Sequence, residues 1–288
     1  MVRKTRLFDR AARLEGRGRA VSLPIMLSAA LVTASAVLVQ GAPVPGGAPT
    51  GIPAGGVVVE LFHSEGCSSC PPVGDMANRL VAQARKQGMP VYVLGYHVDY
   101  FNNLGWKDPF SQPAWTARQT EYVQKLRLPG LATPTMLMNG HLWLSSNVAF
   151  QKFGDLLNAE LNQPPVARLS LAGIKAVGGK VTADVSVEGQ ASGLVLYAAL
   201  VERGLVSQVT AGENKGKTLQ HDHTVRALVS QPWPQDGKPK VEIPVPEGVK
   251  LANASVVVFL QDPATLRIFL ARGADVEAPK PGQAAPGE

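Results

Sequence analysis

Cysteine is almost missing from this sequence: only two of its 288 residues are cysteines, Cys67 and Cys70, three positions apart. A disulfide between them would close a ring of about four residues, which stabilises a fold by about 2 kcal/mol, against about 3 kcal/mol for fifteen residues. The spacing therefore argues against a purely structural staple. No cysteine lies directly after the apolar N-terminal segment, which argues against a lipid-anchored N-terminus.

The sequence also lacks an excess of charge beyond its first 42 residues. The formal net charge is +6, but residues 1–42 carry seven basic and two acidic residues and so contribute +5. The rest has 21 basic and 20 acidic residues. A nucleic-acid-binding protein needs a clustered basic face, so we expect no nucleic-acid partner.

The N-terminus is typical of an export signal. A basic region ends at Arg19, residues 20–40 carry no charge, and Ala34-Ser35-Ala36 is a small-x-small cleavage site. The alternative is an uncleaved membrane anchor within residues 20–40, since about 20 uncharged residues can span a bilayer. Either reading places residues 43–288 in the periplasm or outside the cell, where disulfides persist.

The two cysteines lie where a strand is expected to meet a helix. Val57 to Phe62 is a continuous apolar run, and a helical apolar pattern follows from Val73 to Ala84, with Gly88 as its stop. The positive end of a helix dipole favours a thiolate and can lower its pKa from about 8.5 to roughly 3.5–7.5. We therefore expect Cys67 to attack disulfides and Cys70 to resolve the mixed disulfide. A non-catalytic disulfide and a metal site remain the alternatives.

Further elements follow in the order strand, helix, hairpin and helix. Pro90 to Val98 is strand-like, and a helix is expected from Pro113, capped by Ser111, to about Leu126. Asn139-Gly140 predicts a hairpin between 135–139 and 141–145. Ser146 and Asn147 are possible caps for a last helix, whose buried face is marked by Phe150, Phe153, Leu156, Leu157 and Leu161.

This order resembles the thioredoxin fold. The match includes Thr133-Pro134 directly before the third strand, where thioredoxin-like proteins carry a cis-proline facing the C-x-x-C motif. The resemblance implies a cis Thr133–Pro134 bond and pairing of the Thr133 backbone with an extended substrate. Ordinary thioredoxins have Gly-Pro between their cysteines, where this chain has Ser-Ser.

The sequence more closely resembles a family of bacterial exported, thioredoxin-like proteins catalogued as domain of unknown function 1223. The similarity covers about residues 57–272 and is carried by Glu-Leu-Phe-x-Ser-x-Gly-Cys-Ser-Ser-Cys-Pro-Pro (60–72), His-Val-Asp-Tyr (97–100), Leu-Gly-Trp-Lys-Asp-Pro-Phe (104–110), Thr-Pro-Thr-Met-Leu-Met-Asn-Gly (133–140), Gly-Glu-Asn-x-Gly (212–216) and Val-Arg (225–226). The family implies a fold but no substrate.

The pattern changes beyond the Asn162–Pro165 linker. Val181 to Val187 alternates with polar residues, Val241 to Val245 alternates again, and 194–201 and 256–260 are continuous apolar runs. We expect a thioredoxin-like α/β domain at 57–163, then an all-β, Ig-like sandwich at 166–273. The Pro/Gly-rich stretches 43–56 and 274–288 read as a linker and a disordered tail.

Polar residues near the cysteines have several possible roles. Glu60 matches the buried acid of thioredoxins and could shuttle the proton of Cys70, unless it points to solvent. His63 and His97 could join the cysteines in a soft metal site, but packing at the strand ends is favoured for them, so we expect no cofactor. His221 and His223 are interpreted as structural or solvent-facing.

Aromatic residues gather between the second strand and the second helix. Trp106 and Phe110, with Tyr100, Phe101 and Trp115, could form a rim beside Cys67 that grips an extended peptide, or could pack on the protein's own core. The leading hypothesis is an exported thiol–disulfide oxidoreductase acting on protein or small-molecule thiols and disulfides together with a redox partner protein. A binding module without turnover and a copper or other metal carrier are the alternatives.

Overall fold

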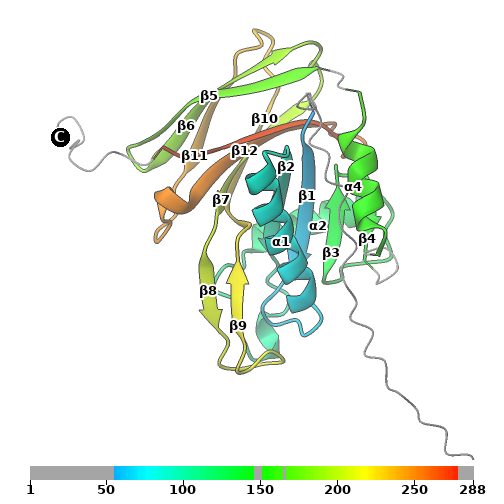
Figure 1. Cartoon of the computed structure of the whole chain (residues 1–288), viewed down its shortest axis with the longest axis vertical. Helices are drawn as coiled ribbons and strands as arrows, with labels where there is room; N and C mark the ends of the chain where they lie inside the picture. The colour runs from blue at the N-terminus through cyan, green and yellow to red at the C-terminus, as the bar shows by residue number, and fades with distance from the viewer. Residues whose placement is uncertain (1–54, 146–150, 165–166, 278–288) are drawn as a thin grey trace, which may run out of the picture. The chain divides into compact units, whose positions relative to one another are not determined.

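A computed structural model of the chain describes residues 55–145, 151–164 and 167–277, all within one compact unit (Figure 1). The export signal or anchor, most of the linker and the proposed caps Ser146 and Asn147 lie outside the described residues. No helix in the described ranges has the length and apolar character needed to cross a membrane.

Strands make up most of the regular secondary structure in the described chain, and they are organised around one large mixed sheet. Its eight strands lie in the order β13-β12-β7-β10-β2-β1-β3-β4. Their bounds are β1 Val57–His63, β2 Val91–His97, β3 Thr135–Met138, β4 Leu142–Leu144, β7 Val195–Glu202, β10 Thr224–Pro232, β12 Ala254–Gln261 and β13 Ile268–Asp275. A three-stranded sheet contains β5 Arg168–Val177, β6 Lys180–Glu188 and β11 Lys240–Pro244, and a hairpin pairs β8 Leu205–Gln208 with β9 Thr218–His221.

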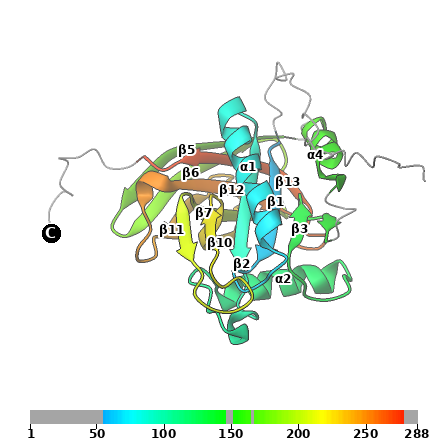
Figure 2. The same ribbon diagram turned by 60° about the horizontal axis from the view of Figure 1, so that its bottom comes forward.

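Three α-helices are described: α1 Pro71–Gln87, α2 Pro113–Lys125 and α4 Phe153–Leu161, with 3-10 turns at Asn102–Leu104 and Leu251–Asn253. Alternate residues of β1 point to opposite faces. One set packs with α1 and α4, and the other packs with Trp115 and Tyr122 of α2. Figure 2 shows α1 and α2 apart, with β1 and β2 between them. The three-stranded sheet covers alternate residues of β7 and β12.

The expected thioredoxin-like α/β domain followed by a β-sandwich is wrong as a description of this fold. Strands from both halves form one sheet, because β10 pairs in parallel with β2 at Thr224 and Gly95. The Gly95 N–H donates to the His223 carbonyl at 2.6 Å, and a Cβ on Gly95 would lie 2.4 Å from the His223 ring. A glycine inside a strand allows this close approach, and the continuous apolar runs at 194–201 and 256–260, which form most of β7 and β12, did not reveal their partners.

Several local predictions are confirmed. β1 and β2 pair in parallel around α1, which ends at Gly88 in the left-handed conformation. Asn139 and Gly140 both have positive φ between the antiparallel strands β3 and β4. The cap of α2 differs: Gln112, not Ser111, precedes the helix, and its side chain makes no capping bond.

Candidate functional site

The C-x-x-C segment lies where β1 passes into α1. Cys70 is the residue immediately before α1, whose first two positions are Pro71 and Pro72, as the sequence predicted. Both cysteines are free thiols, so the structure represents the reduced form. Each is only 2% exposed, although Ser68 and Ser69 between them are exposed. Both side chains are therefore almost completely covered, although the expected attack of Cys67 on a disulfide requires that sulfur to be reachable.

The two sulfurs have opposite electrostatic environments. A hydrogen bond from Cys70 lowers the pKa of Cys67 to about 6, with further help from Ser69 and against the effect of burial. Burial raises the pKa of Cys70 far above its ordinary value, and the hydrogen bond to Cys67 raises it further. At neutral pH, Cys67 is therefore the thiolate and Cys70 the thiol, which is the division of roles expected for an attacking and a resolving cysteine.

The Thr133–Pro134 peptide lies directly against this sulfur pair. The bond is cis, as the resemblance implied. The Cys67 sulfur lies 3.7 Å from the Thr133 carbonyl oxygen and 3.2 Å from Ser69 Oγ. Thr133 and Pro134 are half-buried, and the preceding Leu131 is 44% exposed. The surface beside Cys67 thus contains backbone and one exposed apolar side chain.

A loop far along the chain holds the C-x-x-C backbone in place. The Asn214 side chain is buried and donates at 2.8 Å to the carbonyl oxygens of both Glu65 and Cys67. Glu213 accepts from the Ser68 N–H at 2.9 Å. In the sequence, residues 212–216 stood out only as one of the motifs shared with the family. That motif was the signal available from the sequence, but only the tertiary structure shows that it contacts residue 67.

Glu60 is buried, so the solvent-facing alternative is wrong. Its Oε1 accepts from Arg118 Nε at 2.6 Å, and its Oε2 accepts from the Tyr122 hydroxyl. The Arg118 guanidinium also lies over the rings of Tyr197 and Tyr96. Both carboxylate oxygens are therefore committed to a structural ion pair, and no contact links Glu60 with Cys70. We do not retain Glu60 as the proton shuttle.

The aromatic segment packs inward rather than forming an open rim. Trp106 is half-buried and donates from Nε1 to Glu65 Oε2 at 2.9 Å. Phe110 lies edge-on to His97, with ring centroids 5.3 Å apart. Trp115 is buried against Tyr96 in the core. Trp106 and Phe110 therefore contact the polar groups beneath the cysteines.

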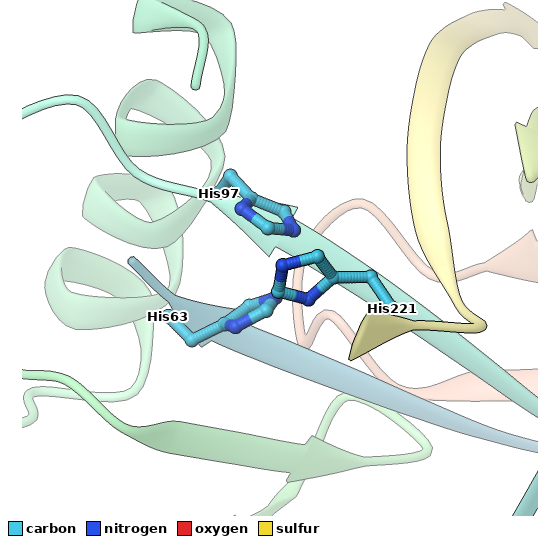
Figure 3. Close-up of side chains that lie close together, drawn as sticks. All are labelled: His63, His97 and His221. Carbon is cyan, nitrogen blue, oxygen red and sulfur yellow. The ribbon is translucent and has the colours of Figure 1, made fainter. Parts of the chain in front are cut away.

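Four of the five histidines of the chain meet in one buried cluster. His63 ends β1, His97 ends β2 and His221 ends β9, while His223 lies just before β10. Figure 3 shows the rings of His63, His97 and His221 turned toward one another. Each offers a nitrogen within 4.8 Å of the others. The structure thus unites the two weak metal candidates with His221, which the sequence interpreted as structural or solvent-facing.

Two carboxylates orient this cluster. Asp108 Oδ2 lies 2.8 Å from His97 Nδ1, and Glu65 Oε1 lies 2.8 Å from His221 Nε2; all four side chains are buried. Sequence reasoning missed both acids. Glu65 and Asp108 lie inside the quoted motifs, yet they are 156 and 11 residues from their histidine partners. Only the folded chain shows what they contact.

Burial keeps most of these rings neutral. Desolvation lowers the pKa of His63, His221 and His223 below the ordinary value, and repulsion between neighbouring imidazoles adds to the effect. For His221 the bond to Glu65 opposes the shift. Burial alone would raise the pKa of Asp108, but the facing His97 brings it below the ordinary value.

Two cavities border this half of the molecule. A small one, of about 20 Å³, is bordered by Cys70, His63, His221 and Glu65, and so lies next to both the Cys70 thiol and two of the histidines. A larger one, of about 380 Å³, lies between the end of α1 and β13. Its Arg85 and Arg203 both pair with Asp275, and no cysteine or histidine lines it. The thiol and imidazole groups therefore border the small cavity and not the larger one.

Comparisons with known proteins identify a family and a fold. The family model described as "Protein of unknown function (DUF1223)" matches residues 58–261. A crystal structure of a protein from Agrobacterium tumefaciens is similar over 82% of this chain and 100% of that one, with 23% identity and a TM-score of 0.57. At that identity the likeness concerns the fold alone. No match was found among the curated proteins.

Proposed function

Because this chain belongs to the DUF1223 family of proteins of unknown function, we propose its function from the site: it is a thiol–disulfide oxidoreductase using Cys67 and Cys70. One observation carries the proposal. The two thiols are polarised in opposite directions at the start of α1, with the pKa of Cys67 lowered to about 6 and that of Cys70 raised. A structural cysteine pair has no need of this asymmetry.

The reaction follows from that asymmetry. The Cys67 thiolate attacks one sulfur of a partner disulfide, and the other partner sulfur leaves as a thiolate. Cys70 then loses its proton and attacks the Cys67 sulfur, which forms the Cys67–Cys70 disulfide and releases the second partner thiol. Two electrons pass from the cysteine pair to the partner. The same steps in reverse oxidise a partner dithiol.

The backbone at Thr133 is the proposed docking edge for the partner. Its carbonyl oxygen is next to the attacking sulfur, and Leu131 and Ser68 are exposed beside it. An extended segment bearing the disulfide could pair with this backbone and reach Cys67. Trp106 and Phe110, which contact Glu65 and His97, support the site from beneath.

The burial of both sulfurs supports a second candidate, a binding module without turnover. Two thiols at 2% exposure each are protected from large reagents. In that case the surface at Thr133 would bind a partner without exchanging electrons. The reduction potential of the pair separates the candidates, since a hard-to-reduce bond favours the module.

We also infer that the protein works outside the cytoplasm. The basic and then uncharged N-terminal sequence supports export, with residues 20–40 as a cleaved signal or an anchor. Fusing residues 1–42 to a reporter that is active only after export tests this. Reporter activity is expected, and activity confined to the cytoplasm would contradict the inference.

The central experiment is trapping of a mixed disulfide. Cys70→Ala removes the resolving thiol, so Cys67 adducts should accumulate in periplasmic extracts and disappear on reduction. Cys67→Ala/Cys70→Ala is the matched control. The intact protein should catalyse insulin reduction by dithiothreitol. Absence of Cys67-dependent adducts together with absence of insulin reduction would falsify the oxidoreductase proposal and favour the binding module.

A further inference from the structure

The histidine cluster below the thiols contains buried nitrogen atoms with no hydrogen-bond partner. His63 Nε2 and His221 Nδ1 are both buried and unpartnered within the described residues. His97 Nε2 has only a 3.5 Å contact with Thr224 Oγ1. Leaving a buried polar atom without a partner destabilises a fold. One nitrogen of each of these three rings lies within 4.8 Å of the others, which indicates a ligand that they share.

Asp108 and Glu65 each bind one nitrogen of a histidine ring and leave the second nitrogen of that ring available to a ligand. Asp108 occupies His97 Nδ1 and Glu65 occupies His221 Nε2, so Nε2 of His97 and Nδ1 of His221 remain. Metal-binding histidines almost always pair their second nitrogen with a carboxylate or carbonyl in this way, which fixes the tautomer and the ring orientation. Trp106 in turn orients Glu65, and the Phe110 N–H orients Asp108.

Charge also suits a cation. Glu65 and Asp108 bring two buried carboxylates to the edge of the cluster, which balance the charge of a divalent ion.

We propose that His63, His97 and His221 bind a divalent first-row transition-metal ion, with zinc as the best fit, through three imidazole nitrogens. Zinc–nitrogen bonds of about 2.0–2.1 Å in a tetrahedral site place the nitrogens about 3.4 Å apart. The present nitrogens lie within 4.8 Å, so the rings close by up to about 1.4 Å. The cavity beside Cys70 lies next to two of the ligands and offers the fourth position to a water molecule.

This site differs from the one considered from sequence, which joined His63 and His97 to the cysteines. The geometric cluster contains three imidazoles and no sulfur. His223 packs beside it, with its ring centroid 5.6 Å from that of His63, and its Nδ1 faces Asn78 Oδ1. The Nε2 of His223 is also buried and unpartnered, but His223 lies outside the group of three histidines whose nitrogens lie within 4.8 Å of one another, so we assign it as a neighbour of the site and not as a ligand.

Calorimetric titration of the chelator-treated, reduced protein with Zn²⁺ tests the proposal. We expect one ion per chain, and Co²⁺ should give the visible absorption of a tetrahedral nitrogen-rich site. His221→Gln should weaken Zn²⁺ binding at least 100-fold, and Glu65→Gln about 10- to 100-fold. His141→Gln is the matched control, because His141 is the one histidine outside the cluster, and it should bind like the unmodified protein.

The Cys67→Ala/Cys70→Ala variant makes the outcome independent of the redox proposal. It should bind Zn²⁺ with unchanged affinity; loss of binding would place the metal on the thiolates and overturn the imidazole site. No stoichiometric binding by the intact protein, or equal weakening in His141→Gln, would also overturn it. If His221→Gln fails to fold, the imidazole NMR signals of the intact protein decide: Zn²⁺ should shift those of His63, His97 and His221, and leave that of His141.

Discussion

Two buried polar clusters share strand β1 and differ in one respect. Glu60 and His63 are three residues apart, so they point to opposite faces of the sheet. The Glu60 carboxylate has both oxygens bound by Arg118 and Tyr122. On the other face, His63 and His221 retain unpartnered nitrogens. A buried carboxylate with both oxygens bound stabilises the fold, whereas several buried nitrogens left without a partner point to a missing ligand or a chemical role.

The largest expected effect concerns the satisfied cluster. Arg118→Met leaves the Glu60 carboxylate buried without its cation, and breaking a buried ion pair costs about 3–5 kcal/mol. Urea unfolding should show this loss of stability, while Zn²⁺ affinity and insulin reduction of the folded fraction stay unchanged. If Arg118→Met lowered Zn²⁺ affinity with little loss of stability, the comparison of the two clusters would be reversed.

The corresponding change in the unsatisfied cluster should cost much less. His63→Leu removes a buried nitrogen that lacks a partner and replaces the ring with an apolar side chain. The unfolding free energy of the metal-free protein should therefore change by about 1 kcal/mol or less, because the lost packing is offset by the removed polar atom. Zn²⁺ binding should be lost. A destabilisation as large as that of Arg118→Met would make His63 a structural residue.

Acidification should sharpen the contrast. The pKa of His63, His221 and His223 is lowered in the folded protein, so below about pH 6.5 the unfolded chain binds protons that the folded chain does not. Stability is thus full above pH 6.5 and falls as the pH drops toward 5, by up to about 1.4 kcal/mol per pH unit for each ring. His223→Gln should reduce the dependence of the unfolding free energy on pH, measured by unfolding the metal-free protein. An unchanged pH dependence would mean that the His223 ring is already protonated in the folded protein.

The smallest expected effect concerns the thiols. Alkylation of Cys67 by iodoacetamide should follow a titration with a midpoint at pH about 6. His221→Gln should leave that midpoint nearly unchanged, because Cys70, Ser69 and Thr133 set it and no histidine contributes. Cys70→Ala, which removes the largest cause, should move the midpoint upward. A large shift in His221→Gln would show that the histidine cluster and the thiols are one electrostatic unit.

Local sequence determined the elements that depend on neighbouring residues. The strand before the cysteines, the start of α1 at Pro71 and the turn at Asn139-Gly140 follow from apolar spacing, from proline at a helix start and from the tolerance of Asn and Gly for positive φ. The family and the cis bond at Pro134 came from resemblance. The local signals concern neighbouring residues, and the resemblance to thioredoxins extends only to the contact of Pro134 with the cysteines, so the pairing of β10 with β2 was not foreseen.

The sequence by itself determined where the two thiols lie and that a strand and a helix flank them. Tertiary structure alone decided which side chains form the polar cluster next to the thiols. His221 joins His63 and His97, and Glu65 and Asn214 meet across about 150 residues, because β10 pairs with β2 and brings the β8–β9 hairpin over α1. Periodicity reports which face of a strand is buried, but it carries no information on which distant strand covers that face.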